Sequence, residues 1–156
     1  MADGWHPKIS RLHTSWLRLR NDGLLPGRAD FDPTMVPTLL PNIWLIDAQA
    51  DPLRFRFRLA GTSIVFAVGQ ELTGRWLDEH FQGFESSVFA EDLKGAVRDG
   101  KPRHYRGSSA VQFARDVAEV ERIALPLAGN GRNVDMLLGL TVFLDGKGQE
   151  IGPPRR

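Results

Sequence analysis

Residues 54–59 read RFRFRL, a strict alternation of charged and apolar side chains. Successive side chains of a β-strand point to opposite faces of a sheet, so the alternation predicts a strand with one charged and one apolar face. Phe55, Phe57 and Leu59 share the apolar face, and we expect all three to point inward, beneath a layer of helices.

The segments on either side of this strand extend the prediction. Residues 43–48 are apolar and rich in strand-forming residues, and residues 49–52 supply turn chemistry, so the two strands should form a hairpin. After the strand, residues 62–68 indicate a short helical turn. A longer helix is expected to begin at Ser86 or Ser87 and to end at Gly100.

The last third of the chain predicts three more strands, over about residues 103–113, 117–127 and 134–144. Asn130-Gly131 is a strong hairpin dipeptide between the second and the third. The third strand is apolar almost throughout, as a central strand covered on both faces would be. Two early strands, several helices and three late strands indicate an α+β fold built on an antiparallel sheet.

This order of elements resembles the PAS fold, and several segments resemble a bacterial branch of stand-alone PAS proteins. The segments that carry the resemblance are residues 28–33 (RADFDP), 39–41 (LLP), 54–62 (RFRFRLAGT), 72–75 (LTGR), 100–102 (GKP), 125–127 (LPL) and 134–139 (VDMLLG). Each is weak alone, but their order and spacing over residues 12–144 make the combination fairly specific.

The resemblance implies a five-stranded sheet in the order 2-1-5-4-3, with helices on one face and an N-terminal helix. Strand five would then be central and strand two an edge, where charged side chains discourage pairing with other chains. The expected organisation is an N-terminal amphipathic helix and cap over residues 1–24, a PAS-like domain over residues 25–147, and a disordered tail over residues 148–156.

The resemblance also implies a cavity between the sheet and the helices. The side chains expected to line it are Phe57, Phe66, Trp76, Phe81, Phe89, Met136 and Leu138, with Arg75 placed to hold an anionic group. This lining would favour a small apolar or aromatic ligand. The alternative is that the same side chains fill the core, because protein interiors are close-packed.

The chain contains no cysteine, which excludes disulfides and thiolate chemistry. The resemblance therefore implies neither a flavin-adduct photosensor nor a thiol-linked chromophore. His80 lies where haem-binding relatives carry their ligand, but a lone histidine beside a helix end is more often a surface group, so haem is not expected. No metal motif is present, and the prediction is a protein without a cofactor.

Large apolar side chains fall on one side of a helix over residues 9–19. In PAS proteins, which this chain resembles, such a helix often packs against its twin in a homodimer. The resemblance therefore makes Leu12, Trp16 and Leu19 candidate interface residues. Packing of this helix against its own domain is the alternative.

The net charge of +1 gives no general attraction to nucleic acid or to an anionic membrane. No apolar run reaches the length of a membrane span, and the expected location is the cytoplasm. The leading hypothesis is a sensory module, not an enzyme, that binds a small ligand or a separate signalling protein. The alternatives are a ligand-free adaptor and a cone-shaped enzyme similar to ketosteroid isomerases, in which Tyr105 would act with Asp47 or Asp135.

Overall fold

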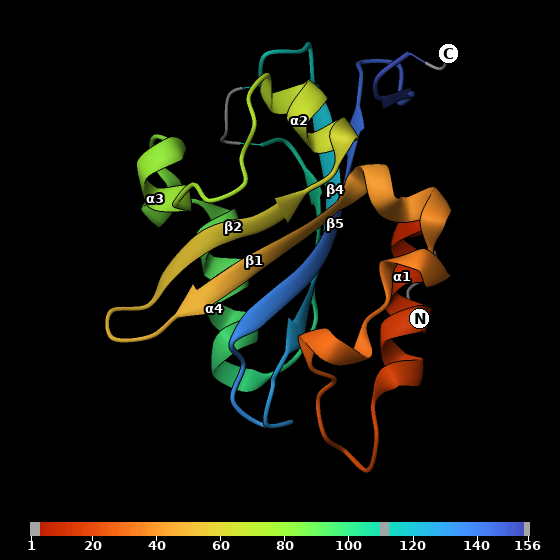
Figure 1. Cartoon of the computed structure of the whole chain (residues 1–156). Helices are drawn as coiled ribbons and strands as arrows, with labels where there is room; N and C mark the ends of the chain where they lie inside the picture. Colours follow the sequence, from red (N-terminus) through yellow and green to blue (C-terminus); the bar gives the residue numbers. More distant parts are fainter. Residues whose placement is uncertain (1–3, 110–112, 155–156) are drawn as a thin grey trace.

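The computed structural model of the chain describes residues 4–109 and 113–154. Its centre is an antiparallel sheet in the order β2-β1-β5-β4-β3, with a short β6 beside β5 (Figure 1). The strands are β1 (Ile43–Gln49), β2 (Arg54–Ala60), β3 (Arg103–Gly107), β4 (Glu119–Leu127), β5 (Met136–Leu144) and β6 (Glu150–Ile151). The predicted α+β fold, strand order and central position of the last long strand are confirmed.

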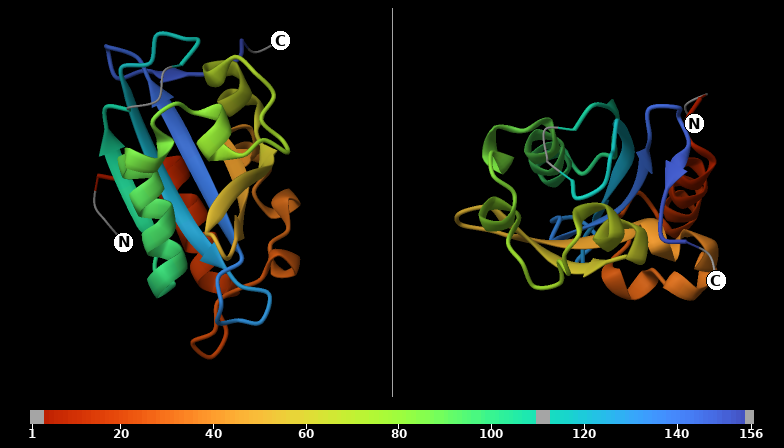
Figure 2. Two further views of the ribbon diagram at one scale, coloured as in Figure 1. Left: turned by 90° about the vertical axis from the view of Figure 1, so that its left-hand side faces the viewer. Right: turned by 90° about the horizontal axis from the view of Figure 1, so that it is seen from above.

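The helices lie on both sides of this sheet. They are α1 (Pro7–Leu19), α2 (Thr62–Val68), α3 (Leu77–His80) and α4 (Val88–Asp99), with short 3-10 helices at Arg28–Asp30, Pro33–Met35, Pro37–Asn42 and Phe84–Ser86. Seen from above, α2, α3 and α4 cover one face of the sheet and α1 covers the other (Figure 2). We call these the inner and the outer face.

Each face has its own apolar core, because neighbouring residues of a strand point in opposite directions. On β5, Leu138 and Leu140 belong to the outer core together with the apolar stripe of α1. Leu137 and Phe143 belong to the inner core beneath α2 and α4. The apolar sequence of β5 therefore serves both layers.

The strand β2 contains a β-bulge that changes which of its side chains point inward. Leu45 pairs with Leu59, but the next residue, Ile46, pairs with Phe57, so Arg58 is an extra residue. An extra residue reverses the facing of every side chain beyond it. Phe57 is 4% exposed in the inner core, whereas Leu59 is 38% exposed, and the prediction that Leu59 points inward is wrong.

The helix α1 packs against the outer face of its own sheet. Leu12 is completely buried, Trp16 is 1% exposed, and Leu19 packs partly buried against the same core. The indole Nε1 of Trp16 donates a hydrogen bond of 2.9 Å to the carbonyl of Pro126 in β4. These contacts favour the alternative in which the apolar stripe serves the domain itself, and a homodimer stays a prediction.

Two predicted segments end differently in the structure. The strand expected over residues 103–113 ends at Gly107, and residues 110–112 of that prediction lie outside the described residues. The tail expected to be disordered from residue 148 pairs with β5 through Glu150 and Ile151, so that prediction is wrong for these residues. Residues 155–156 of the tail also lie outside the described part of the chain.

Candidate ligand cavity

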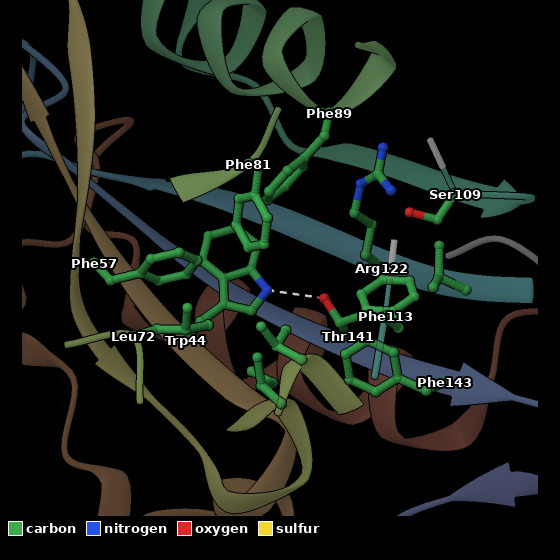
Figure 3. A pocket seen from close by; sticks show the side chains of 13 residues that line it. Trp44, Phe57, Leu72, Phe81, Phe89, Ser109, Phe113, Arg122, Thr141 and Phe143 are labelled. Atoms are coloured by element: carbon green, nitrogen blue, oxygen red, sulfur yellow. Dashed lines mark hydrogen bonds between the residues drawn. The ribbon is translucent and has the colours of Figure 1, made fainter. Parts of the chain in front are cut away.

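A cavity of about 60 Å³ lies between the inner face of the sheet and the helices that cover it (Figure 3). Most of the side chains around it are aromatic or aliphatic. They are Trp44, Phe57, Ile64, Val68, Leu72, Phe81, Phe89, Ser109, Phe113, Val120, Arg122, Thr141 and Phe143. A dry apolar cavity of about 150 Å³ admits benzene, so this one is small for an organic ligand as it stands.

One wall of the cavity is formed by Trp44 of β1, whose indole lies across the neighbouring strand β5. Its Nε1 donates a 3.0 Å hydrogen bond to Oγ1 of Thr141, which satisfies the only polar atom of a buried ring. The ring passes so close to Gly139 that a Cβ atom there would lie 1.9 Å from Cζ2 of Trp44. Glycine at this position is therefore what allows the indole to lie flat against β5.

Arg122 of β4 brings a charge to the cavity wall. Its side chain is 9% exposed, and its ion pair with Asp92 of α4 is 3.5 Å long. The guanidinium carbon lies 4.7 Å from the ring centre of Phe89 and 4.2 Å from that of Tyr105. Burial lowers the pKa of Arg122 and raises the pKa of Asp92 in spite of their mutual attraction, so desolvation outweighs the pairing for both groups.

A second pocket of about 210 Å³ adjoins the first. The two pockets share three lining residues, Phe89, Ser109 and Arg122. The outer pocket is otherwise lined by Ser87, Val88, Tyr105 and Ser108, between the start of α4 and the end of β3. Arg122 thus stands at the junction between an apolar inner cavity and a more polar outer one.

Comparison with known protein families identifies the fold. A family model described as "PAS domain" matches residues 5–142, most of the chain. The chain belongs to the PAS domain family. The comparison with curated protein sequences gave no match.

Solved structures similar to this PAS domain include two light-oxygen-voltage (LOV) domains. The first, described under "Flavin Analogue Sheds Light on Light-Oxygen-Voltage Domain Mechanism", has a TM-score of 0.51 and 17% identity and covers 73% of this chain and 84% of its own. The second, a fungal LOV domain photoreceptor linked to blue light and oxidative stress, has a TM-score of 0.50 and 14% identity and covers 86% of this chain and 91% of its own. At these identities the likeness shows the shared fold.

The prediction that the protein has no cofactor is wrong, because its reasoning does not exclude a noncovalent cofactor. It rested on the missing cysteine, and cysteine is required only for a thiol adduct. A structural neighbour of this PAS domain is a LOV domain studied with a flavin analogue. The side chains that line the inner cavity nevertheless do not fit a flavin ring system in this conformation, because ligand pockets typically measure about 300–1,000 Å³ and the cavity measures about 60 Å³.

The structure brings together only part of the predicted lining. Phe57, Phe81 and Phe89 meet at the inner cavity, as predicted. Three predicted members lie elsewhere, because each is engaged by a neighbour outside the cavity. The ring of Phe66 contacts Arg115, Trp76 contacts Arg54 and Arg56, and Nε of Arg75 donates to the carbonyl of Glu71.

Two predicted lining residues on β5 point to the wrong side of the sheet. Met136 and Leu138 belong to the outer core, and the β5 residues at the cavity are Thr141 and Phe143. The sequence prediction also missed Arg122. The signal that could have found it is the alternation of β4, which places Arg122 on the same face as the apolar Val120 and Ala124.

Other chemistry considered from the sequence has no support in the site. The hydroxyl of Tyr105 donates to the carbonyl of Ser108, while Asp47 pairs with Arg58 and Asp135 accepts from the amide of Gly129. The acid and base of the enzyme alternative are therefore not brought together. Within residues 4–109 and 113–154 no cluster of three metal-ligating side chains occurs, and no helix there is long and apolar enough to cross a membrane.

Proposed function

We propose that this PAS domain is a sensory module that binds a small, mainly apolar ligand in the inner cavity and signals by non-covalent association with a partner protein. The observation that carries the proposal is the cavity itself, which lies among aromatic side chains of the inner core. Protein interiors are close-packed, so an internal space beside large, rigid rings must be maintained by the way those rings are held.

The ligand would act by favouring one of two packing states. A ligand shifts such an equilibrium only by the difference in its affinity for the two states. The cavity has about 60 Å³ in the present state, so a ligand of organic size would favour a state in which the rings around it have moved apart. Trp44 is the side chain through which we expect the sheet to respond, because β1 carries inner and outer core residues alternately.

The experiment compares the wild-type protein with a variant in which the cavity is filled. Val120 of β4 lines the cavity, and Val120→Phe places a ring in that space. Leu17→Phe, at an exposed position of α1, is the control. The thermal unfolding temperature is measured with and without benzene, indole and riboflavin, and native mass spectrometry detects retained small molecules.

We expect at least one probe to raise the unfolding temperature of the wild type and the control, and not that of Val120→Phe. Riboflavin in the set tests noncovalent flavin binding, which would also give visible absorbance that comigrates with the protein. A wild type that no probe stabilises, and that retains no small molecule on purification, would favour the ligand-free adaptor instead.

A further inference from the structure

We propose that the ligand of this cavity is a small carboxylic acid, whose carboxylate pairs with Arg122 and whose apolar part extends from there into the inner cavity. The inference rests on the proposed function, because it names the chemical class of the ligand of that same site.

The first argument is that the charge of Arg122 is incompletely compensated. A guanidinium carries five N–H donors, and a buried charge is costly unless it is paired and hydrogen-bonded. Its charged partner among the described residues, Asp92, lies at 3.5 Å, beyond the usual range of a charge-assisted hydrogen bond. Its Nε is buried without a hydrogen-bond partner in the same part of the chain.

The second argument is the direction from which a partner can come. Phe89 and Tyr105 lie against the guanidinium and offer it ring faces, and the Tyr105 hydroxyl is already engaged with Ser108. These ring contacts are not hydrogen bonds, so they do not satisfy the N–H groups of the guanidinium, which lie in its plane. A carboxylate is the group whose two oxygens match that planar fork.

The third argument concerns what surrounds the charge. Among the described residues that line the inner cavity, Arg122 is the only charged one, and most of the others are aromatic or aliphatic. This environment favours an anion with an apolar body and disfavours a cation. Figure 3 shows the guanidinium of Arg122 beside Phe89 and Ser109, at the edge of the ring cluster.

Benzoate and benzamide test the inference, because they have the same shape and differ in charge. Charge-assisted hydrogen bonds contribute about 1.5–3 kcal/mol, so we expect the wild type to bind benzoate roughly 10-fold to 100-fold more tightly than benzamide by isothermal titration calorimetry. Arg122→Met keeps an unbranched apolar side chain at this position and removes the charged guanidinium. It should bring the two affinities to within about twofold, whereas Arg18→Met, the same change at an exposed position of α1, should leave the preference unchanged.

Asp92→Asn gives an independent reading, because Asp92 competes with a bound carboxylate for Arg122. We expect this variant to bind benzoate more tightly than the wild type does, and benzamide equally well. If Arg122→Met does not fold, the benzoate affinity of Asp92→Asn still tests whether a carboxylate pairs with Arg122. A tighter benzoate complex supports the inference, and an unchanged or weaker one overturns it.

The outcomes separate the two proposals. Equal binding of benzoate and benzamide by the wild type overturns the carboxylate and leaves the apolar cavity standing. A benzoate preference that survives in Arg122→Met also overturns it, because the anion then binds elsewhere. If neither compound nor any neutral apolar probe binds, the proposed function itself fails.

Discussion

Gly139→Ala is the substitution that tests the cavity wall most directly. Gly139 lies in the centre of β5, opposite Trp44 of β1, and a Cβ atom there would lie 1.9, 2.1 and 2.2 Å from three atoms of the indole. Carbon atoms in contact are about 3.5–4.0 Å apart, so the ring would have to retreat by roughly 1.5 Å or more. Overpacking of this kind costs about 1–3 kcal/mol.

The retreat also costs a hydrogen bond. Nε1 of Trp44 donates to Oγ1 of Thr141 at 3.0 Å, and a ring displaced from β5 loses that contact. A lost hydrogen bond of this kind adds about 1 kcal/mol. We therefore expect Gly139→Ala to lower the free energy of unfolding by about 2–4 kcal/mol, which corresponds to roughly 5–15 °C in a chain of this size.

The assay is urea unfolding of a double-mutant cycle with Trp44→Leu. A smaller side chain at position 44 leaves room for the Cβ atom, so Gly139→Ala should cost less than about 1 kcal/mol in that background. The coupling between the two sites should be about 1–3 kcal/mol. If Gly139→Ala costs the same in both backgrounds, or is neutral in the wild type, the indole does not lie on β5 and our description of the cavity wall is wrong.

Three further predictions concern other parts of the domain. Trp16→Phe removes the hydrogen bond to Pro126 and should lower the free energy of unfolding by about 1–2 kcal/mol, with no change of oligomeric state in light scattering, because Trp16 packs inside its own domain. Phe57→Ala should cost about 3–5 kcal/mol and Leu59→Ala less than about 1 kcal/mol in the same assay, and equal losses would contradict the bulge in β2. Burial lowers the pKa of His13, so the unfolded state takes up the proton first and stability should fall as the pH drops below about 6.5. His13→Gln should flatten that part of the urea-unfolding profile, and a wild type equally stable at pH 7.5 and pH 5.5 would contradict this.

The fold could be predicted from sequence because its determinants are local and periodic. The alternation at residues 54–59, the Asn130-Gly131 turn and the Ser87 cap of α4 each specify one element. Ser87, one of the two caps that the sequence allowed, accepts from the amide of Ala90, and α4 ends at Gly100 in the left-handed conformation, as the sequence indicates. The order of these elements indicates an α+β fold, and the order of the strands in the sheet came from the resemblance to PAS proteins.

The face of the sheet to which each side chain points could not be predicted equally well. On β5 both faces are buried, and its one polar residue, Thr141, is buried at the cavity, so no exposed polar residue marks which of Leu137 and Leu138 points inward. The sequence analysis placed Leu138 on the inner face, and the structure places Leu137 there. On β2 the pattern does mark the faces, but the bulge at Arg58 interrupts it. A bulge depends on the partner strand as well as on its own sequence, so the alternation at Leu59 pointed to the wrong face.

The charges of β4 explain both why Arg122 was missed and why it matters. Glu121 and Arg122 are adjacent and opposite in sign, which in a sequence resembles a solvated pair. In a strand they point to opposite faces, so neither can compensate the other, and both are buried. Glu121, on the outer face, accepts the amide of His6 at 2.9 Å and lies 2.9 Å from Nε2 of His104.

Among the described residues each of these two side chains keeps one buried atom without a hydrogen-bond partner, Oε1 of Glu121 and Nε of Arg122, but Oε2 of Glu121 also has the two close contacts given above, and Arg122, on the inner face, has none as short. Within the described residues its charge faces one carboxylate, at 3.5 Å, and its buried Nε has no hydrogen-bond partner. A buried guanidinium with so few hydrogen bonds does not recover its cost of desolvation. The folded domain is therefore less stable than it would be with hydrophobic side chains of similar size in place of the ion pair. Arg122→Met combined with Asp92→Asn, which removes both charges of the pair, should therefore leave the stability of the ligand-free domain unchanged or raise it, and a loss of several kcal/mol in urea unfolding would show instead that the arginine is a structural residue.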